Sequence, residues 1–419
     1  MSSLLIQNVR LDDRITDIAI RDNRIAAIGD VPADQTFDQT LDGTGLLACP
    51  PFYNTHTHAA MTLLRGMADK LQLFDWLNNH IWPAEATLTP ELIHWGTKLA
   101  CLEMIKSGTV FLNDMYFRPV VNARACDEMG LRAAVGMQYL DINEQVKAAN
   151  EQDTRDLLAA RDSFSDRIQF TLAPHAVYTV SEPAFREVAE RSVAEGYRIH
   201  LHLAETQQEV DDCQRLHHGL TPTQYLDSLG VLTDQTIAAH AIHLTDQDID
   251  TLAQRGVWLS HNACSNFKLN SGSFRFRDAL ARGCRITIGT DGCASNDSLS
   301  MFDDMKTAVF NARHQANDAT AAGAADVLTC ATRNGARAFG IDAGVIEPGR
   351  LADIMLINTR TPQMLAEHDW KANLVYACDS ACVHTLICDG RVLMLNRHVP
   401  AEADILDHVQ VLLRNWRRH

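Results

Sequence analysis

The middle of the chain, residues 50–345, alternates apolar, strand-like runs with helix-like stretches. Helices are predicted at 90–106 and 182–194, among others. The predicted strands cover 46–54, 110–113, 133–137, 168–172, 199–203, 237–240, 257–260 and 286–289. Strand–helix alternation favours a parallel sheet, and eight such units predict an α/β fold, a closed (β/α)8 barrel of the TIM type.

Both ends of the chain differ from this middle because they consist of short β-rich runs. These runs lie at 4–6, 15–20 and 24–28, and again at 352–357, 383–388 and 391–394, with the hairpin signal Asp389-Gly390 between the last two. We therefore expect residues 1–49 and 346–400 to build one small β-sandwich domain. Residues 50–345 form the barrel, and 401–419 form a C-terminal helix.

Charge and cysteine content narrow the class of protein. The 37 basic and 53 acidic residues give a net charge of −16, which argues against nucleic-acid and anionic-membrane partners. No run approaches the roughly 20 apolar residues of a membrane span, and the first residues do not resemble a signal peptide. The 11 cysteines form no CxxC pair, so we expect reduced thiols and a cytoplasmic protein.

The 18 histidines are more informative than the bulk numbers. His56 and His58 end the first predicted strand, where residues two apart share a face. Active sites of TIM barrels form at that end of the strands. Two imidazoles on one face suit zinc or a similar divalent ion, although an HxH pair alone is also typical of a half-exposed loop.

Other predicted strands end in similar residues. His202, His240 and Asp291 each end a different strand, and Glu205 follows His202 by three residues. Chance rarely places such a set at one end of one barrel. His243 is an alternative to His240 as the inward residue, and His200 is expected to be a buried, hydrogen-bonded core histidine.

These residue types suggest metal-assisted hydrolysis of a C–N or related bond. A divalent ion with open coordination activates water near neutral pH. Asp291, beside the ion, suits the role of the base that accepts the proton of this water. Glu205, a carboxylate that does not ligate, suits the role of proton donor to the electrophile.

Several motifs now indicate a family. They are NTHTHAAMTLLRG at 54–66, WL at 76–77, IWPAE at 81–85, DMYF at 114–117, PHAVY at 174–178, HLAET at 202–206, AHA at 239–241, SHNACSN at 260–266 and GTDGCASN at 289–296. Together they resemble the metal-dependent amidohydrolase superfamily. More narrowly, they resemble its branch of 5′-methylthioadenosine/S-adenosylhomocysteine deaminases and s-triazine hydrolases.

The resemblance implies a hydrolase of C–N bonds in cyclic amidines with one divalent ion per subunit. Zinc is the expected ion, with Fe²⁺ and Mn²⁺ as alternatives. The implied ligands are His56, His58, His202 and Asp291, while His240 hydrogen-bonds the attacking water or completes the shell. Glu205 would protonate a ring nitrogen, and Asp291 would pass the proton of water to departing ammonia.

The same resemblance implies residues that hold the substrate. Glu85 would bind the ribose hydroxyls and His175 the nucleoside. On sequence alone these residues are only a carboxylate in a first helical turn and a histidine at a strand end. Ser295 either lines the pocket or caps the following helix.

The implied substrate is a small molecule, an adenine nucleoside deaminated at C6 to the inosine analogue and ammonia. S-adenosylhomocysteine is disfavoured because Met137 stands where an arginine for its carboxylate is expected, and 141–145 offers no second one. 5′-Methylthioadenosine, 5′-deoxyadenosine and adenosine remain. Relatives suggest a homo-oligomer, either a dimer or a tetramer.

Three other functions compete with this one. The first is another aminohydrolase or chlorohydrolase of the same branch, acting on guanine, a pterin or an s-triazine. The second is a non-catalytic barrel, which the retained metal shell and Glu205 disfavour. The third is a nucleic-acid deaminase, which the charge of −16 disfavours.

Overall fold

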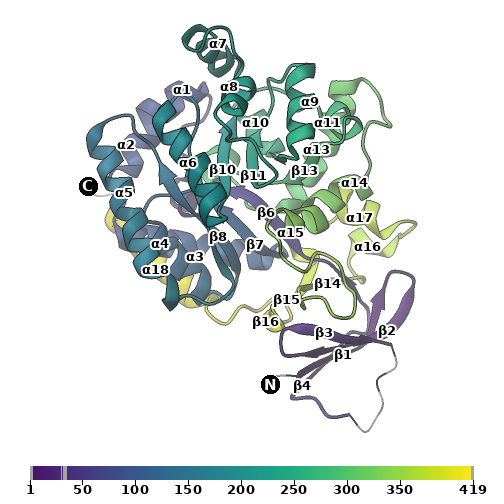
Figure 1. The fold of residues 1–419 in the computed structure, drawn as a ribbon. Helices are drawn as coiled ribbons and strands as arrows, with labels where there is room; N and C mark the ends of the chain where they lie inside the picture. Colours follow the sequence, from purple (N-terminus) through teal and green to yellow (C-terminus); the bar gives the residue numbers. More distant parts are fainter. Residues whose placement is uncertain (1–2, 30, 32–34, 417–419) are drawn as a thin grey trace.

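The computed structural model describes residues 3–29, 31 and 35–416, which form a barrel with a separate sheet beside it (Figure 1). The barrel strands are β6 (Phe52–Thr57), β7 (Thr109–Asp114), β8 (Arg132–Tyr139), β9 (Ile168–Pro174), β10 (Arg198–Leu203), β11 (Thr236–His240), β12 (Trp258–His261) and β13 (Arg285–Ile288). They pair in parallel and in chain order. The N–H of Asp291 donates to the carbonyl of His56 at 3.0 Å and brings the two outer strands together. The predicted TIM-type barrel is confirmed.

One predicted strand is wrong in its extent. The run 46–54 divides into two strands, β5 (Leu46–Cys49) and β6, with Pro50 and Pro51 between them. Strand β5 pairs with the sheet outside the barrel. Proline lacks an N–H, so this run cannot continue as one ladder. The two prolines therefore mark the place where the chain passes from one sheet to the other.

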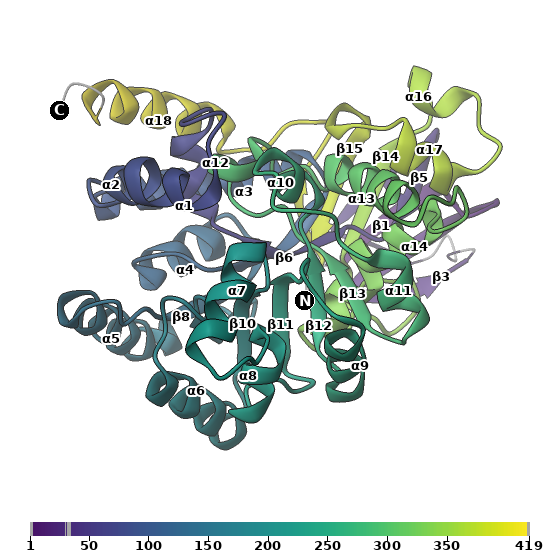
Figure 2. The same cartoon turned by 90° about the horizontal axis from the view of Figure 1, so that it is seen from above.

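Helices surround the barrel (Figure 2). Helix α3 (Pro90–Lys106) begins at the cap Thr89, whose hydroxyl accepts the N–H of Leu92. The other helices are α4 (Pro119–Glu128), α5 (Glu144–Ala159), α6 (Glu182–Glu195), α7 (Gln207–Leu216), α8 (Pro222–Ser228), α9 (Asp246–Arg255), α10 (Ala263–Lys268), α11 (Phe276–Ala281), α12 (Cys293–Asn296), α13 (Met301–Ala316), α14 (Ala324–Thr329), α15 (Gly335–Ala338), α16 (Pro362–Leu365) and α17 (Trp370–Tyr376), with short turns η3 (Arg161–Ser163), η4 (Cys330–Asn334) and η5 (Ser380–Cys382).

Between β6 and α3 the chain forms a cover over a cavity at the C-terminal ends of the barrel strands. It consists of η1 (Ala59–Leu64), α1 (Leu73–Trp76), η2 (Leu77–Ile81) and α2 (Trp82–Glu85). The C-terminal helix α18 (Glu402–Trp416) packs along α3, and the indole of Trp416 donates to the hydroxyl of Thr87 at 2.8 Å. The predicted helix at the C-terminus is present, and residues 417–419 lie outside the described residues.

The separate sheet draws strands from both ends of the chain. Its order is β16-β15-β14-β5-β1-β2-β3, with β4 beside β1. The bounds are β1 (Ser3–Leu11), β2 (Arg14–Arg21), β3 (Arg24–Ile28), β4 (Gln39–Asp42), β14 (Ile354–Asn358), β15 (Val383–Cys388) and β16 (Arg391–Met394). In β5, Leu46 and Ala48 pack into the core of this sheet, while Leu47 and Cys49 pack into the core of the barrel.

A buried polar cluster joins the two parts. Asp353, which is fully buried, accepts hydrogen bonds from the guanidinium of Arg132 at 3.0 Å and from the hydroxyl of Tyr53 at 2.8 Å. Arg132 and Tyr53 belong to barrel strands, and Asp353 precedes β14. No helix of the described residues is long and apolar enough to cross a membrane.

Candidate active site

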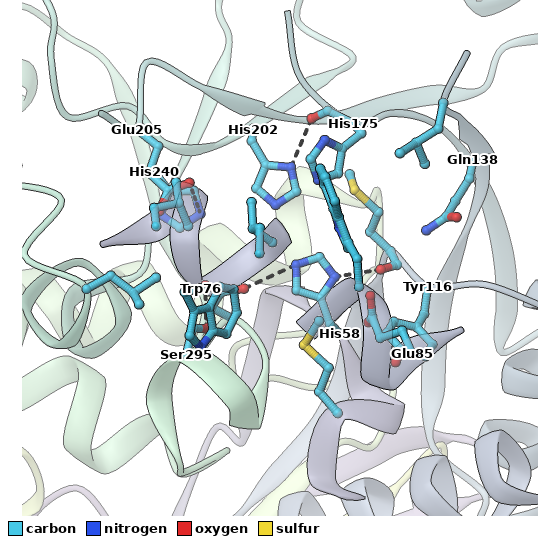
Figure 3. Close-up of a pocket in the computed structure, with 18 of the residues that line it drawn as sticks. His58, Trp76, Glu85, Tyr116, Gln138, His175, His202, Glu205, His240 and Ser295 are labelled. Atoms are coloured by element: carbon cyan, nitrogen blue, oxygen red, sulfur yellow. Dashed lines mark hydrogen bonds and ion pairs between the residues drawn. The ribbon is translucent and has the colours of Figure 1, made fainter. Parts of the chain in front are cut away.

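Imidazoles and a carboxylate from four strands meet at the C-terminal end of the barrel (Figure 3). His56 and His58 come from the end of β6, His202 from β10, His240 from β11, and Asp291 from just after β13. One ring nitrogen each of His56, His202 and His240 lies within 4.8 Å of the others. A ring nitrogen of His56, one of His58 and a carboxylate oxygen of Asp291 also lie within 4.8 Å of one another. The structure thus brings together all five residues predicted for the metal shell.

The free atoms of this cluster suit a divalent cation. Oδ1 of Asp291 lies 3.2 Å from Nε2 of His58 and 3.3 Å from Nε2 of His56. Nε2 of His56 is buried and forms no hydrogen bond. A buried nitrogen without a partner is costly, and three imidazoles with a carboxylate are the donors that zinc prefers. The residues present fit such an ion.

Hydrogen bonds on the far side of the rings hold the histidines in place. Nδ1 of His58 donates to the carbonyl of Met115 at 2.6 Å, and Nδ1 of His202 to the carbonyl of His175 at 2.9 Å. Nδ1 of His240 donates to the side-chain oxygen of Asn266 at 2.8 Å. Such bonds leave Nε2 as the lone-pair donor that a metal needs.

Two neighbouring histidines lie outside the cluster. His200 is fully buried and lies 2.8 Å from Nδ1 of His56, so the prediction of a hydrogen-bonded core histidine is confirmed. Nε2 of His243 donates to the carbonyl of Ser271 at 2.6 Å. Of the two candidates on this loop, it is therefore His240 that joins the cluster.

Asp291 is oriented by two hydroxyls. Its Oδ2 accepts from Ser265 at 2.6 Å and from Ser295 at 2.8 Å, which leaves Oδ1 toward the histidines. Ser295 lies within the short helix α12 and lines the cavity. The geometry therefore favours the pocket role over the helix-cap role for Ser295.

Glu205 lies beside the cluster without belonging to either ligand group. Its Oε2 is 3.8 Å from Nε2 of His240, and its Oε1 accepts from Ser271 at 3.1 Å. Burial raises the pKa of Glu205, so this carboxyl keeps its proton to a higher pH than an exposed glutamate does. The carboxylate of Glu209 accepts the backbone N–H groups of Ala204 and Glu205, both at 2.9 Å, and so fixes this turn.

The backbone is strained where these residues leave their strands. Ala204, His240, Ala241 and Asp291 have φ values of 47°, 69°, 50° and 63°. Residues other than glycine rarely adopt this left-handed region, and such strain is concentrated at functional sites. The turns direct the side chains of His240 and Asp291 toward the cluster.

A cavity opens above the cluster, and the proposed substrate residues line it. Glu85 reaches it from α2 and His175 from the end of β9. Burial raises the pKa of Glu85 to about 7 and lowers that of His175 to about 3, so His175 is neutral. Nδ1 of His175 lies 2.9 Å from the hydroxyl of Thr179.

Further residues of the site were not predicted from the sequence. Tyr116 lies within the family motif at 114–117, and Ser265 and Asn266 lie within the motif at 260–266. Their position in these motifs is the signal that could have indicated them. Gln138 and Ser271 carried no such signal, because their neighbours in the site come from distant parts of the chain. Among the described residues, no lysine or arginine lines this cavity.

Comparisons with known proteins agree with this geometry. The model of the Amidohydrolase family matches residues 47–393. A 5′-deoxyadenosine deaminase of Methanothermobacter thermautotrophicus is 44% identical over 397 residues, which are 94% of this chain and 92% of that protein. The 5-methylthioadenosine/S-adenosylhomocysteine deaminase 1 of Archaeoglobus fulgidus is 44% identical over 368 residues, which are 85% of this chain and 84% of that protein.

Solved structures extend the likeness over the whole fold. An adenosine deaminase from Xanthomonas campestris with bound zinc superposes with a TM-score of 0.93 at 33% identity, covering 100% of this chain and 99% of that one. A triazine hydrolase of Arthrobacter aurescens has a TM-score of 0.90 at 22% identity, covering 99% and 100%, and shares the fold alone. With its TIM-type barrel, its His/Asp cluster and these relatives, the chain belongs to the amidohydrolase family.

Proposed function

We propose that this chain is a metal-dependent aminohydrolase that deaminates an adenine nucleoside at C6. The observation that carries the proposal is the buried carboxyl of Glu205, held beside the His/Asp cluster by Ser271 and not part of either ligand group. A protonated acid next to a metal site is what the attack of water on an aromatic ring requires. The relatives named as deaminases support this assignment.

His56, His58, His202 and Asp291 would hold one divalent ion, with zinc expected and Fe²⁺ or Mn²⁺ as alternatives. When bound, such an ion supplies the Lewis acidity that makes water nucleophilic near neutral pH. His240 lies within reach of the same position and either orients the attacking water or completes the ligand set.

Two carboxyl groups move the protons. The oxygen of the water forms a bond to C6, and Asp291 accepts a proton from this water at the same time. Glu205 donates its proton to the ring nitrogen next to C6, so that the ring accepts the electron pair displaced by the attack. Asp291 then gives its proton to the amino group, the C6–N bond breaks as the C6–O bond becomes a carbonyl, and ammonia leaves. The proton of the C6 hydroxyl returns to Glu205, which restores both carboxyl groups.

The remaining cavity residues would position the nucleoside. Glu85 would accept hydrogen bonds from the ribose hydroxyls, His175 would hold the nucleoside, and Ser295 would keep Asp291 in its orientation. Because no lysine or arginine of the described part of the chain lines the cavity, a substrate carboxylate finds no charged partner among these residues. This favours 5′-methylthioadenosine, 5′-deoxyadenosine and adenosine over S-adenosylhomocysteine.

We also propose a homo-oligomer, either a dimer or a tetramer, because the relatives suggest one. The cysteine content supports a cytoplasmic location, and the net charge of −16 argues against nucleic-acid and membrane partners. The pattern of strands and helices supports a barrel at 50–345, a sandwich built from 1–49 and 346–400, and a helix at 401–419.

Ammonia release from a panel of substrates tests the proposal. The zinc-loaded protein should deaminate 5′-deoxyadenosine, 5′-methylthioadenosine or adenosine faster than S-adenosylhomocysteine, guanine or melamine. Hydrolysis of guanine or a triazine without activity on any adenine nucleoside would contradict it.

A further inference from the structure

A fully buried carboxyl group lies behind the active site, on a helix that contributes no residue to the metal cluster. It belongs to Asp304, in the first turn of α13. Among the residues that the structure describes, no cation forms an ion pair with it. Burial raises the pKa of Asp304 to about 7, which reflects the cost of placing a carboxylate there. A costly group of this kind calls for a function, and its hydrogen bonds indicate one.

Each oxygen of Asp304 accepts a hydrogen bond from a different element at the C-terminal end of the barrel. Oδ1 accepts the backbone N–H of Cys264 at 3.0 Å, and Oδ2 accepts the side-chain amide of Asn296 at 2.9 Å. Cys264 lies in the first turn of α10, whose own N-cap residue Asn262 makes no side-chain capping bond. Asn296 ends α12. Helix α10 packs against both α12 and α13 (Figure 2), and one side chain of α13 therefore joins the elements that follow β12 and β13.

The residues beside these two contacts are the serines that orient Asp291. Ser265 follows Cys264 along the chain and donates its hydroxyl to Oδ2 of Asp291 at 2.6 Å. Ser295 precedes Asn296 and donates to the same oxygen at 2.8 Å. Because each serine is next to a residue that Asp304 holds, the distance between the two hydroxyls depends on Asp304.

The amide of Asn296 also links Asp304 to the main chain at Asp291. An amide group carries two N–H donors, and Nδ2 of Asn296 binds the carbonyl of Thr290 at 2.7 Å as well. Thr290 directly precedes Asp291, whose φ of 63° lies in the left-handed region. Such a backbone persists only where its surroundings hold it. The contacts of Asp304 therefore act on both the side chain and the main chain of Asp291.

We propose that Asp304 is a positioning residue of this active site. It fixes the two serines in the arrangement in which both bind Oδ2 of Asp291, so that Oδ1 stays 3.3 Å from His56 and 3.2 Å from His58. Without Asp304 the two elements can separate, and Asp291 can turn away from the position in which it holds the metal and accepts a proton. This inference rests on the proposed function, because it concerns the part that Asp291 plays there.

The test is Asp304→Asn, which keeps the shape of the side chain but places an NH2 group against one of the two donors. Zinc affinity, measured by competition with a chromophoric chelator, should fall about tenfold, as should kcat for 5′-deoxyadenosine at saturating zinc. KM should change less than about twofold, because Glu85 and His175 lie on other elements. The matched control is Asp303→Asn, an exposed neighbour in the same turn, which should leave all three values unchanged.

A mutant cycle distinguishes positioning from a general loss of stability. Ser265→Ala with Ser295→Ala removes both hydroxyls through which Asp304 acts, and only the link through Thr290 remains. Adding Asp304→Asn to this background should lower kcat by at most about threefold further. A residue that only supported the fold would lower kcat by the same factor in both backgrounds. Asn296→Ala removes the partner of Oδ2 without altering the buried carboxyl group and should also lower zinc affinity and kcat.

Two results would overturn the inference. One is a folded Asp304→Asn or Asn296→Ala protein whose zinc affinity and kcat both lie within about twofold of wild type. The other is an equal loss of kcat from Asp304→Asn with and without the two serines. Zinc affinity is measured without substrate, so it tests the inference independently of turnover, whereas absence of deamination of every adenine nucleoside by wild type contradicts the proposed function itself.

Discussion

At the scale of single residues, the proposed chemistry depends on two buried carboxyl groups with different surroundings. Burial raises the pKa of Glu205. Burial acts in the same direction on Asp291, but the close contacts of its carboxylate with the imidazoles of His56 and His58 outweigh it and hold the pKa of Asp291 well below its usual range. The two environments therefore shift the pKa values of the two carboxyl groups in opposite directions, which suits one proton donor and one proton acceptor.

Glu205→Gln should retain the metal and lose activity. The amide keeps the shape of the side chain but cannot donate the proton to the ring, so kcat should fall about 10²–10⁴-fold. Steady-state kinetics with metal analysis checks this. Glu195→Gln, an exposed glutamate of α6, is the matched control. Near wild-type turnover in Glu205→Gln would rule out the proposed role.

Glu85 should make nucleoside binding depend on pH. Its pKa of about 7 means that it protonates at a higher pH than an ordinary carboxyl, and protonation removes acceptor capacity for the ribose. The groups that face it are His58 and the hydroxyl of Tyr116. KM for 5′-deoxyadenosine should therefore rise as pH falls from 8 to 6.

Glu85→Gln should remove the part of this pH dependence that comes from Glu85, because the amide does not titrate in this range. Measuring KM from pH 6 to 8 for wild type and variant checks this prediction. The same rise of KM in both proteins would assign the pH dependence to another group.

At the scale of elements, the turns that leave the strands position the site, and the helices behind them hold the barrel. The cap of α8 illustrates this. The hydroxyl of Thr221 accepts the N–H of Gln224 and donates to the carboxylate of Asp248 at 2.6 Å, and Asp248 in turn caps α9 together with Thr245. Two helix N-termini therefore share one buried network.

Thr221→Ala should destabilise the protein more than an ordinary loss of a cap. The substitution removes the cap of α8 and leaves the buried Asp248 without one donor, at a cost of about 2 kcal/mol in the free energy of unfolding. Urea unfolding checks this, with Thr329→Ala on the exposed side of α14 as control. Equal urea midpoints of unfolding for both variants would contradict a stabilising role of the hydrogen-bond network around Asp248.

The elements were predictable where the pattern is local. Eight apolar runs gave the barrel, and polar residues at the ends of those runs gave His56, His58, His202, His240 and Asp291 as a group. The division of 46–54 into two strands was missed because the strand residues on both sides of the two prolines are buried, so periodicity carries no signal there. Contacts such as Ser271 with Glu205 join loops that only the closed barrel brings together.

At the scale of the whole molecule, the cluster of Arg132, Asp353 and Tyr53 connects the barrel to the sheet from both termini. Nη2 of Arg132 also contacts the carboxylate of Asp389 at 2.7 Å, in the turn between β15 and β16. The guanidinium of Arg132 thus contacts the carboxylates of both Asp353 and Asp389.

Arg132→Met should destabilise the fold strongly. It leaves Asp353 as a buried carboxylate without its cation, which typically costs about 3–5 kcal/mol. Adding Asp353→Asn should recover part of the loss, because the unpaired charge is removed. Unfolding free energies of the two single variants and the double variant check this coupling, and strictly additive losses would contradict it.

The dependence of turnover on bound metal decides whether this protein is a metal-dependent deaminase. The protein is stripped with a chelator, titrated with zinc, and assayed at each step for metal content and for release of ammonia from 5′-deoxyadenosine. Activity should rise in proportion to bound zinc and reach its plateau at one ion per chain. Full activity of the stripped protein, or a fully loaded protein that releases no ammonia from any adenine nucleoside, would contradict it.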